Sequence, residues 1–109
     1  GSFLGSHVQH LLQQIHADLL FLGAHAIDRS FGITAPTMEK ALVKKMMIAA
    51  ARQSWIVADS TKFNKQAFAK VCDLEEITGI LTDDRLPDAD RDIFEQKAMI
   101  KYAGSGKER

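Results

Sequence analysis

The fold is decided by a short stretch in the middle of the chain, Q-S-W-I-V-A-D-S-T-K, residues 53–62. Its apolar run, residues 55–58, ends abruptly in a carboxylate, two hydroxyls and an amine. This pattern predicts a buried strand that delivers polar groups to the edge of a sheet, where open α/β sheets bind their ligands. Asp59 and Lys62 are therefore candidates for ligand contact, although solvated side chains at an ordinary strand exit would give the same pattern.

Two further apolar runs, one on each side of this stretch, end in a similar way. Residues 19–22 lead into the polar segment 23–28, and residues 79–82 lead into two aspartates. Continuous apolar runs suit the strands of a parallel sheet covered on both faces, whose loops converge on one edge. His25 lies in the first of these loops, either as a surface residue or as a ligand contact. We therefore predict an α/β fold with a mainly parallel sheet flanked by helices.

A helix is predicted for residues 37–53, since a proline-threonine pair can start it and no glycine or proline interrupts it. At 100° per residue, its apolar arc comprises Leu42, Val43, Met46, Met47, Ala49 and Ala50. Glu39 falls inside this arc, either as a buried carboxylate that needs a partner or as a first-turn residue that favours the helix dipole. Lys40 and Lys44 flank the arc, where they can reach an anionic ligand or cover apolar surface with their stems.

The remaining elements are assigned from shorter patterns. Residues 6–16 carry apolar residues at helical spacing, and residues 64–73 are compatible with either a short strand or an irregular flap. The other predicted elements are a loop over residues 32–37, a helical turn over 74–77 capped by Asp73, a helix over 87–97, a strand over 98–102 and a disordered polar tail over 104–109.

Composition limits the classes of function that the chain can serve. Its 109 residues support one domain, and its 14 basic and 14 acidic residues give no net positive field that would draw it to nucleic acid or anionic membranes. No apolar run reaches the roughly 20 residues of a membrane-spanning helix. The single cysteine forms no internal disulfide, and the histidines of residues 7–16 show no metal-ligand pattern. We expect a cytoplasmic protein.

Several short blocks of sequence follow one another along the chain. They are G-A-H-A-I-D at residues 23–28, G-I-T at 32–34, V-K-K-M-M-I at 43–48, A-D-S-T-K-F at 58–63, A-F-A-K-V at 67–71 and I-L-T-D at 80–83. In this order the blocks resemble the C-terminal sensor domain of DeoR-family transcriptional regulators, over about residues 3–102. We assign residues 3–103 to the C-terminal part of such a domain.

The resemblance implies a fold related to ribose-5-phosphate isomerase and the CoA-transferases, which is Rossmann-like. It also implies that a phosphorylated sugar or related metabolite binds over the strand ends as the inducer of a homo-oligomeric regulator, expected to be a repressor. DNA would be contacted only through a winged helix-turn-helix outside this sequence, and no cofactor or metal is implied. The matching effector-binding positions are Gly23, Ala24, His25, Asp28, Thr34, Glu39, Lys44, Asp59 and Lys62.

The sequence departs from the family pattern at two places. His25 and Ala26 replace an acidic residue and a glycine, and Lys40 stands where an acidic residue is common, with Glu39 one place earlier. The family's first strands and its phosphate loop are also missing, so we expect the chain alone to self-associate and to bind effector weakly. Two alternatives stay open: a sugar-phosphate isomerase that uses Asp28, Glu39 or Asp59 as acid or base, and a module that serves oligomerisation only.

Overall fold

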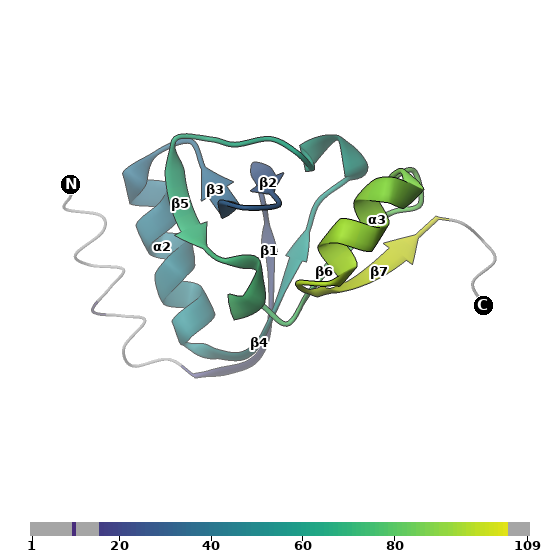
Figure 1. The fold of residues 1–109 in the computed structure, drawn as a ribbon. Coiled ribbons are helices and arrows are strands. Elements are labelled where there is room, and N and C mark those ends of the chain that lie inside the picture. Colours follow the sequence, from purple (N-terminus) through teal and green to yellow (C-terminus); the bar gives the residue numbers. More distant parts are fainter. Residues whose placement is uncertain (1–9, 11–15, 105–109) are drawn as a thin grey trace.

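The computed structural model describes residue 10 and residues 16–104. Its main sheet has four parallel strands in the order β1-β4-β6-β7 (Figure 1). These strands and their two connecting helices are β1 (Ala17–Gly23), α2 (Met38–Ala49), β4 (Ala51–Val57), β6 (Gly79–Asp83), α3 (Asp88–Glu95) and β7 (Met99–Ala103). The predicted parallel α/β architecture is confirmed. The helix expected near residues 6–16 and the tail expected over 104–109 lie outside the described residues, apart from His10, His16 and Gly104.

A second sheet, which the sequence did not predict, lies over the first. Its three antiparallel strands, in the order β2-β3-β5, are β2 (Ala26–Asp28), β3 (Gly32–Ala35) and β5 (Ala69–Cys72). The prediction of a loop for residues 32–37 was therefore wrong, because strands of three or four residues are too short to show a periodic pattern. Gly32 has a φ of 92°, and a Cβ there would lie 2.3 Å from the Cys72 carbonyl oxygen, so only glycine fits.

The helix α2 starts where the sequence predicts but ends earlier. The Thr37 Oγ1 accepts a hydrogen bond from the Lys40 backbone N–H at 3.1 Å and caps the helix. The helix ends at Ala49, not at residue 53, since Ala51 already pairs with Ala17 in the sheet. Residues 50–53 (A-A-R-Q) all favour helices, so the pairing of β4 with β1 overrides their helix propensity. The predicted apolar arc was also misplaced, because Ala41 is the buried residue of α2 whereas Leu42 is 42% exposed.

Three further predictions agree closely with the structure. The turn after Asp73 is a short 3-10 helix (Leu74–Glu76), closed by a capping box between Asp73 and Glu76. The helix α3 and the strand β7 lie within one or two residues of their predicted bounds. The segment 64–73, for which strand and flap were both open, ends in β5, which pairs with β3.

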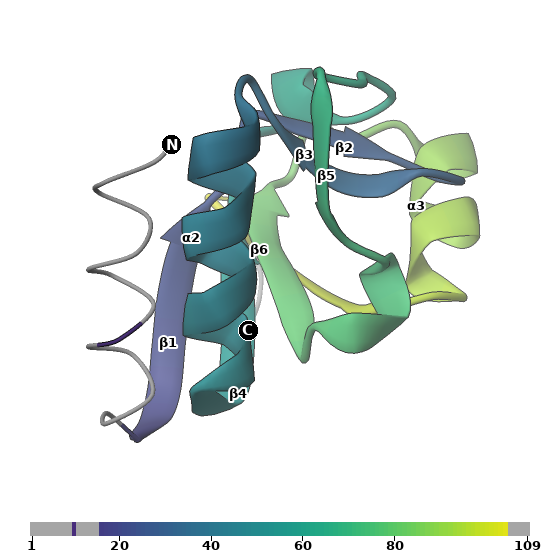
Figure 2. The ribbon, with the colours of Figure 1, turned by 90° about the vertical axis from the view of Figure 1, so that its left-hand side faces the viewer.

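The core lies on one side of the main sheet. The strand order advances in one direction, and right-handed crossovers then place every connection on the same face. Figure 2 shows α2, the small sheet and α3 on that side. The side chains that fill this side come from both sheets and from both helices, and include Ala41, Ile27, Ile33, Ile56, Ile80 and Phe94.

The opposite side of the main sheet carries exposed apolar side chains, which we call the open face. Leu19, Phe21, Val57 and Met99 are each between 46% and 55% exposed. Parallel sheets are normally covered on both faces. The expectation that β1 is covered on both faces is therefore not met within the described part of the chain, although Trp55, on the same face, is 9% exposed. No helix among the described residues is long and apolar enough to span a membrane.

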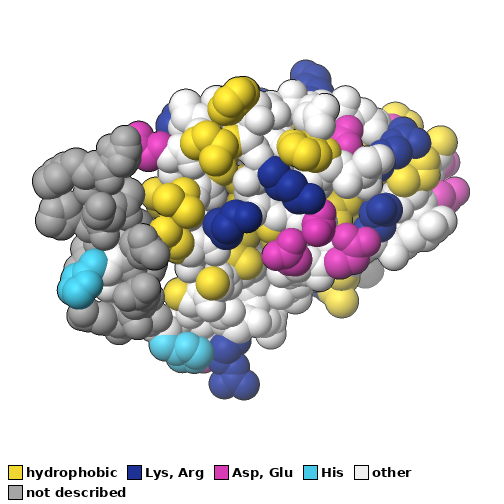
Figure 3. Space-filling model, turned by 60° about the vertical axis from the view of Figure 1, so that its left-hand side comes forward, with side chains coloured by type: hydrophobic (Ala, Val, Ile, Leu, Met, Phe, Trp, Pro, Cys, Tyr) yellow, Lys and Arg dark blue, Asp and Glu magenta, His cyan; other side chains and the backbone are white. Residues whose placement is uncertain are grey.

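The face that bears α2 and β5 mixes apolar and charged side chains (Figure 3). Met38 and Phe68 are 64% and 75% exposed, and the Lys70 ammonium group forms an ion pair with Asp73. Ion pairs at the surface contribute little to stability. The fold therefore depends on the buried side of the main sheet, whose strand ends position the residues described next.

Candidate functional site

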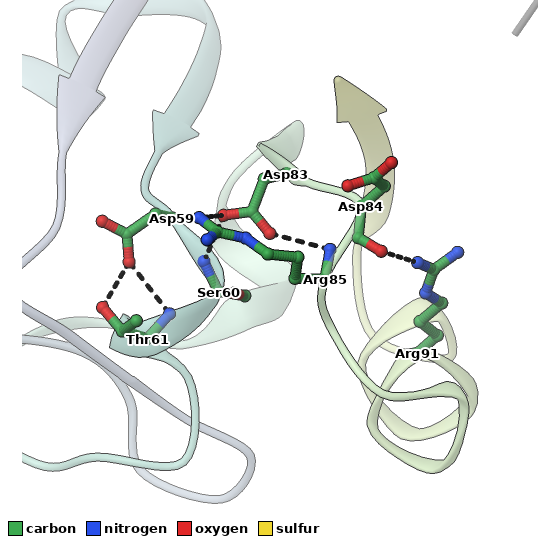
Figure 4. Close-up of polar contacts among 7 residues, drawn as sticks. All are labelled: Asp59, Ser60, Thr61, Asp83, Asp84, Arg85 and Arg91. Atoms are coloured by element: carbon green, nitrogen blue, oxygen red, sulfur yellow. Dashed lines mark hydrogen bonds and ion pairs between the residues drawn. The ribbon is translucent and has the colours of Figure 1, made fainter. Parts of the chain in front are cut away.

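The strand β4 leads directly into a tight turn, residues 59–62, which we call the exit turn. Asp59 caps a 3-10 helix (Ser60–Lys62), and its Oδ1 accepts hydrogen bonds from the Thr61 backbone N–H, at 2.9 Å, and from the Thr61 hydroxyl (Figure 4). These bonds from Thr61, together with the charge of Lys62, hold the pKa of Asp59 below its usual value. Asp59 is therefore an ionised, exposed carboxylate at the carboxyl edge of the sheet.

The end of β6 is tied to this exit turn. Asp83 Oδ2 accepts a hydrogen bond from the Ser60 backbone N–H at 3.0 Å, and Asp83 Oδ1 accepts one from the Arg85 backbone N–H at 2.9 Å. These two backbone bonds are the main reason that the pKa of Asp83 lies well below its ordinary value. Asp83 was recognised in the sequence as part of a polar strand exit, but Asp83, Ser60 and Arg85 were not assigned to the site.

The end of β1 is reached by Lys44 from α2. The Lys44 ammonium group donates a hydrogen bond to the carbonyl oxygen of Gly23, which is the last residue of β1. Burial lowers the pKa of Lys44, and the charge of Lys40 lowers it further. In the sheet register Gly23 pairs with Val57, two residues before Asp59, so the Lys44 ammonium group and the exit turn lie at the ends of neighbouring strands.

A pocket of about 440 Å³ lies along α2, beside the end of β1. Its described lining comprises Leu22, Thr37, Glu39, Lys40, Val43, Lys44 and Met47. Glu39 is exposed in the first turn of the helix, so the interpretation as a buried carboxylate was wrong and the helix-dipole position applies. Lys40 and Lys44 both line the pocket, which gives it two cationic side chains in a mainly apolar wall.

Asp28 and Thr34 have structural contacts away from this pocket. Asp28 Oδ2 accepts hydrogen bonds from the backbone N–H groups of Ser30 and Phe31, at 2.9 and 2.6 Å, and so closes the β2–β3 hairpin. The buried Thr34 hydroxyl donates to the Ala26 carbonyl at 3.3 Å and accepts from the Ala67 backbone N–H at 2.8 Å. Both side chains are thus engaged in holding the small sheet together.

The predicted site residues therefore divide into four groups. Asp59 and Lys62 lie in the exit turn, and Gly23, Glu39 and Lys44 lie at the end of β1 and along α2. His25 is exposed between β1 and β2, whereas the half-buried Ala24 packs against the core. Asp28 and Thr34 hold the hairpin. The described residues contain no group of three or more histidine, cysteine, aspartate or glutamate side chains arranged to hold a metal ion.

Comparison with known proteins identifies a family for this arrangement. Residues 1–84 match the family model described as the DeoR C terminal sensor domain. A putative aga operon transcriptional repressor of Escherichia coli O157:H7 is 35% identical over 86 residues, which are 79% of this chain and 32% of that protein. The HTH-type transcriptional regulator GlpR of Haloferax volcanii is 35% identical over 103 residues, which are 94% of this chain and 40% of that protein.

A third relative is named as an activator, not as a repressor. The L-fucose operon activator of Haemophilus influenzae is 30% identical over 99 residues, 91% of this chain and 40% of that protein. The chain thus spans about a third to two fifths of the length of these curated relatives. Since the family model covers most of the chain, the protein belongs to the family of DeoR C-terminal sensor domains.

Proposed function

We propose that the chain is the effector-sensing part of a DNA-binding transcriptional regulator, and that it binds a phosphorylated sugar or a related anionic metabolite. The relatives are named as transcriptional regulators, among them an aga operon repressor, an L-fucose operon activator and a lactose phosphotransferase system repressor. Because both a repressor and an activator occur among them, the expectation of a repressor stays a proposal. A regulator of this kind would act in the cytoplasm and contact DNA through another part of the protein.

The observation that carries this proposal is the position of the Lys44 ammonium group at the carboxyl end of β1. It lies one strand away from the exit turn, which supplies Lys62 and the carboxylate of Asp59. Cations suit the phosphate group of such a ligand, and a carboxylate suits its hydroxyl groups. We propose that Gly23, Ala24, His25, Glu39, Lys44, Asp59 and Lys62 contact the effector, and that Asp28 and Thr34 position the loop beside it.

Sensing is favoured over catalysis by the state of the carboxylates at this edge. A sugar-phosphate isomerase needs a carboxyl group that takes up and releases a proton near neutral pH. Hydrogen bonds instead hold the pKa values of Asp59 and Asp83 below their usual values, and the carboxylate of Asp28 is occupied by the hairpin turn. These groups support a site that binds a polyol without exchanging protons with it.

A contribution to oligomerisation is supported by the open face. Its four exposed apolar side chains lie on a sheet surface that the described elements leave uncovered. Contiguous exposed apolar patches mark contact surfaces. We propose that this face contacts another part of the assembled regulator, in addition to the sensing role.

The experiment that tests the sensing role compares two lysines of the same segment in the full-length regulator. Lys62 lies in the exit turn, whereas Lys65, three residues later, is exposed and, among the described residues, donates only its backbone N–H, to the Ile27 carbonyl. A charge-assisted contact to phosphate contributes about 1.5 to 3 kcal/mol, so Lys62→Ala should weaken effector binding about tenfold or more. Lys65→Ala should leave it unchanged.

The measurement is a thermal-shift panel of sugar phosphates, followed by release of operator DNA in a gel-shift assay. Both variants should bind operator DNA as the parent does. An effector dose response that is the same in Lys62→Ala and in the parent would contradict the assignment of the exit turn to the effector site.

A further inference from the structure

The side chain of Arg85 extends from the end of β6 toward the exit turn (Figure 4). Its Nη2 donates one hydrogen bond to Asp83 Oδ2, at 3.3 Å, and 73% of the side chain is exposed. The hydrogen bond to Asp83 is the largest cause that raises the pKa of Arg85, and the charges of Asp83, Asp59 and Asp84 raise it further. The guanidinium group therefore lies within electrostatic reach of carboxylates that follow both β4 and β6.

The fold does not depend on this guanidinium contact. Asp83 keeps two backbone donors, the N–H groups of Ser60 and Arg85, when the side chain of Arg85 moves away. A distance of 3.3 Å is long for an N–H···O bond, and an exposed ion pair contributes little to stability. The other N–H groups of the guanidinium have no partner among the described residues, so they are available to a ligand.

A neighbouring arginine shows what a structural role looks like here. Arg91 donates from Nε to the Leu86 carbonyl at 2.8 Å and from Nη2 to the Asp84 carbonyl at 2.6 Å, and it lies over the Tyr102 ring at 4.2 Å. Its side chain is 28% exposed. Arg91 is committed to the turn between β6 and α3, whereas Arg85 makes one long contact and points to the sheet edge.

We propose that Arg85 is a further ligand-binding residue of this edge and takes the phosphate group of a phosphorylated polyol, with Asp83 as the residue that positions it. The inference rests on the proposed sensing function and names a binding residue for it. A guanidinium group presents parallel N–H donors that match two phosphate oxygens. Asp59 Oδ2, which has no hydrogen-bond donor among the described residues, is free to accept from the ligand's hydroxyl groups.

The charge of the edge predicts which ligands bind. Asp59, Asp83 and Asp84 surround Arg85 with negative charge, which disfavours a bare anion. A sugar phosphate offsets this repulsion, because its hydroxyl groups donate to Asp59 while its phosphate group accepts from Arg85. We therefore expect glucose 6-phosphate, ribose 5-phosphate or fructose 1-phosphate to bind more tightly than inorganic phosphate or glucose.

The test is a calorimetric titration of the full-length regulator with these five compounds. Arg85→Gln should weaken sugar-phosphate binding about tenfold or more, and Arg85→Lys, which keeps the charge but not the fork of donors, should lie between it and the parent. The matched control is Arg52→Gln. Arg52 is 71% exposed at the amino end of β4 and has one ion pair, to Asp18 at 4.0 Å.

Each outcome bears on a different claim. If Arg85→Gln binds sugar phosphates as the parent regulator does, the role of Arg85 is overturned and the proposed sensing function stands. If no sugar phosphate binds the parent regulator, the proposed sensing function itself fails, and the role of Arg85 with it. If Arg52→Gln weakens binding as much as Arg85→Gln does, the effect is one of overall charge and the proposal is overturned.

Discussion

Trp55 lies directly on Gly79 of the neighbouring strand. A Cβ added at Gly79 would lie 2.4 Å from Trp55 Cζ3 and 2.7 Å from the Met99 carbonyl oxygen, far inside contact distance. The indole ring therefore occupies the space that a side chain at position 79 would need. This packing buries Trp55 to 9% exposure, although the residue lies on the same side as the open face.

Gly79→Ala should therefore destabilise the fold. Overpacking of this kind costs about 1 to 3 kcal/mol, since the ring or the strand must move. Gly23→Ala is the matched control, because the nearest atom to its Cβ would be the Val57 carbonyl oxygen at 4.0 Å. Urea unfolding of the two variants measures both effects, and equal losses would show that Trp55 does not require glycine beside it.

Thr34→Val should loosen the contact between β3 and the segment before β5. Valine has nearly the same shape as threonine but leaves the half-buried Ala67 N–H without its acceptor, at a cost of about 1 to 3 kcal/mol. Thr34→Ser keeps the hydroxyl group. Hydrogen exchange of the Ala67 amide should accelerate in the valine variant and not in the serine variant; acceleration in both would assign the effect to lost packing.

The hydrogen bonds to Asp83 predict a stability that falls in acid. Because its folded-state pKa is depressed, Asp83 contributes stability that is fully present above its unfolded value of about 3.9 and is lost as the pH falls toward the folded-state pKa. Asp83→Asn should remove this dependence. Urea unfolding at pH 7, 5, 3 and 2 should show a gap between parent and variant that narrows below about pH 4. A gap that is constant with pH would contradict the charged contact.

Lys44 and Lys62 are predicted to face one shared crevice at the carboxyl edge. If both contact the same anionic group, their effects on effector affinity are coupled, because residues that share a partner are not additive. Calorimetry of the full-length regulator with Lys44→Ala, Lys62→Ala and the double variant measures this coupling. Strictly additive losses would indicate that the two lysines serve separate sites.

Self-association of the chain should depend on the open face. Phe21→Lys places a charge among its apolar side chains and should shift the chain toward monomer in light scattering, with little effect on stability. Phe68→Lys is the matched control, because Phe68 is 75% exposed beside β5 on the other side of the main sheet. The prediction fails if the parent chain is already monomeric, or if the Phe68 variant dissociates it equally.

The parallel sheet could be predicted from the sequence, because the apolar runs at residues 19–22, 55–58 and 79–82 are each followed by polar residues. The small sheet could not be predicted, because its strands of three and four residues depend on the turn at Asp28 and on the positive φ of Gly32. The end of α2 was misplaced because pairing with β1 competes with helix propensity. Asp59 and Lys62 were identified from their position after a strand, whereas the role of Asp83 depends on a hydrogen bond to Ser60 across two strands.

The order of strands in the two sheets also determines how the chain can fold during its synthesis. Ala51 pairs with Ala17, Gly79 with Trp55 and Met99 with Gly79, so each strand of the main sheet docks on one that was translated before it. The same holds for β3 on β2 and for β5 on β3. Among the described strands, only β1 and β2, the first strand of each sheet, have to wait for a later segment before they can pair. The sheet can thus grow from the ribosome one strand at a time, and a chain released before β7 lacks only its last edge strand.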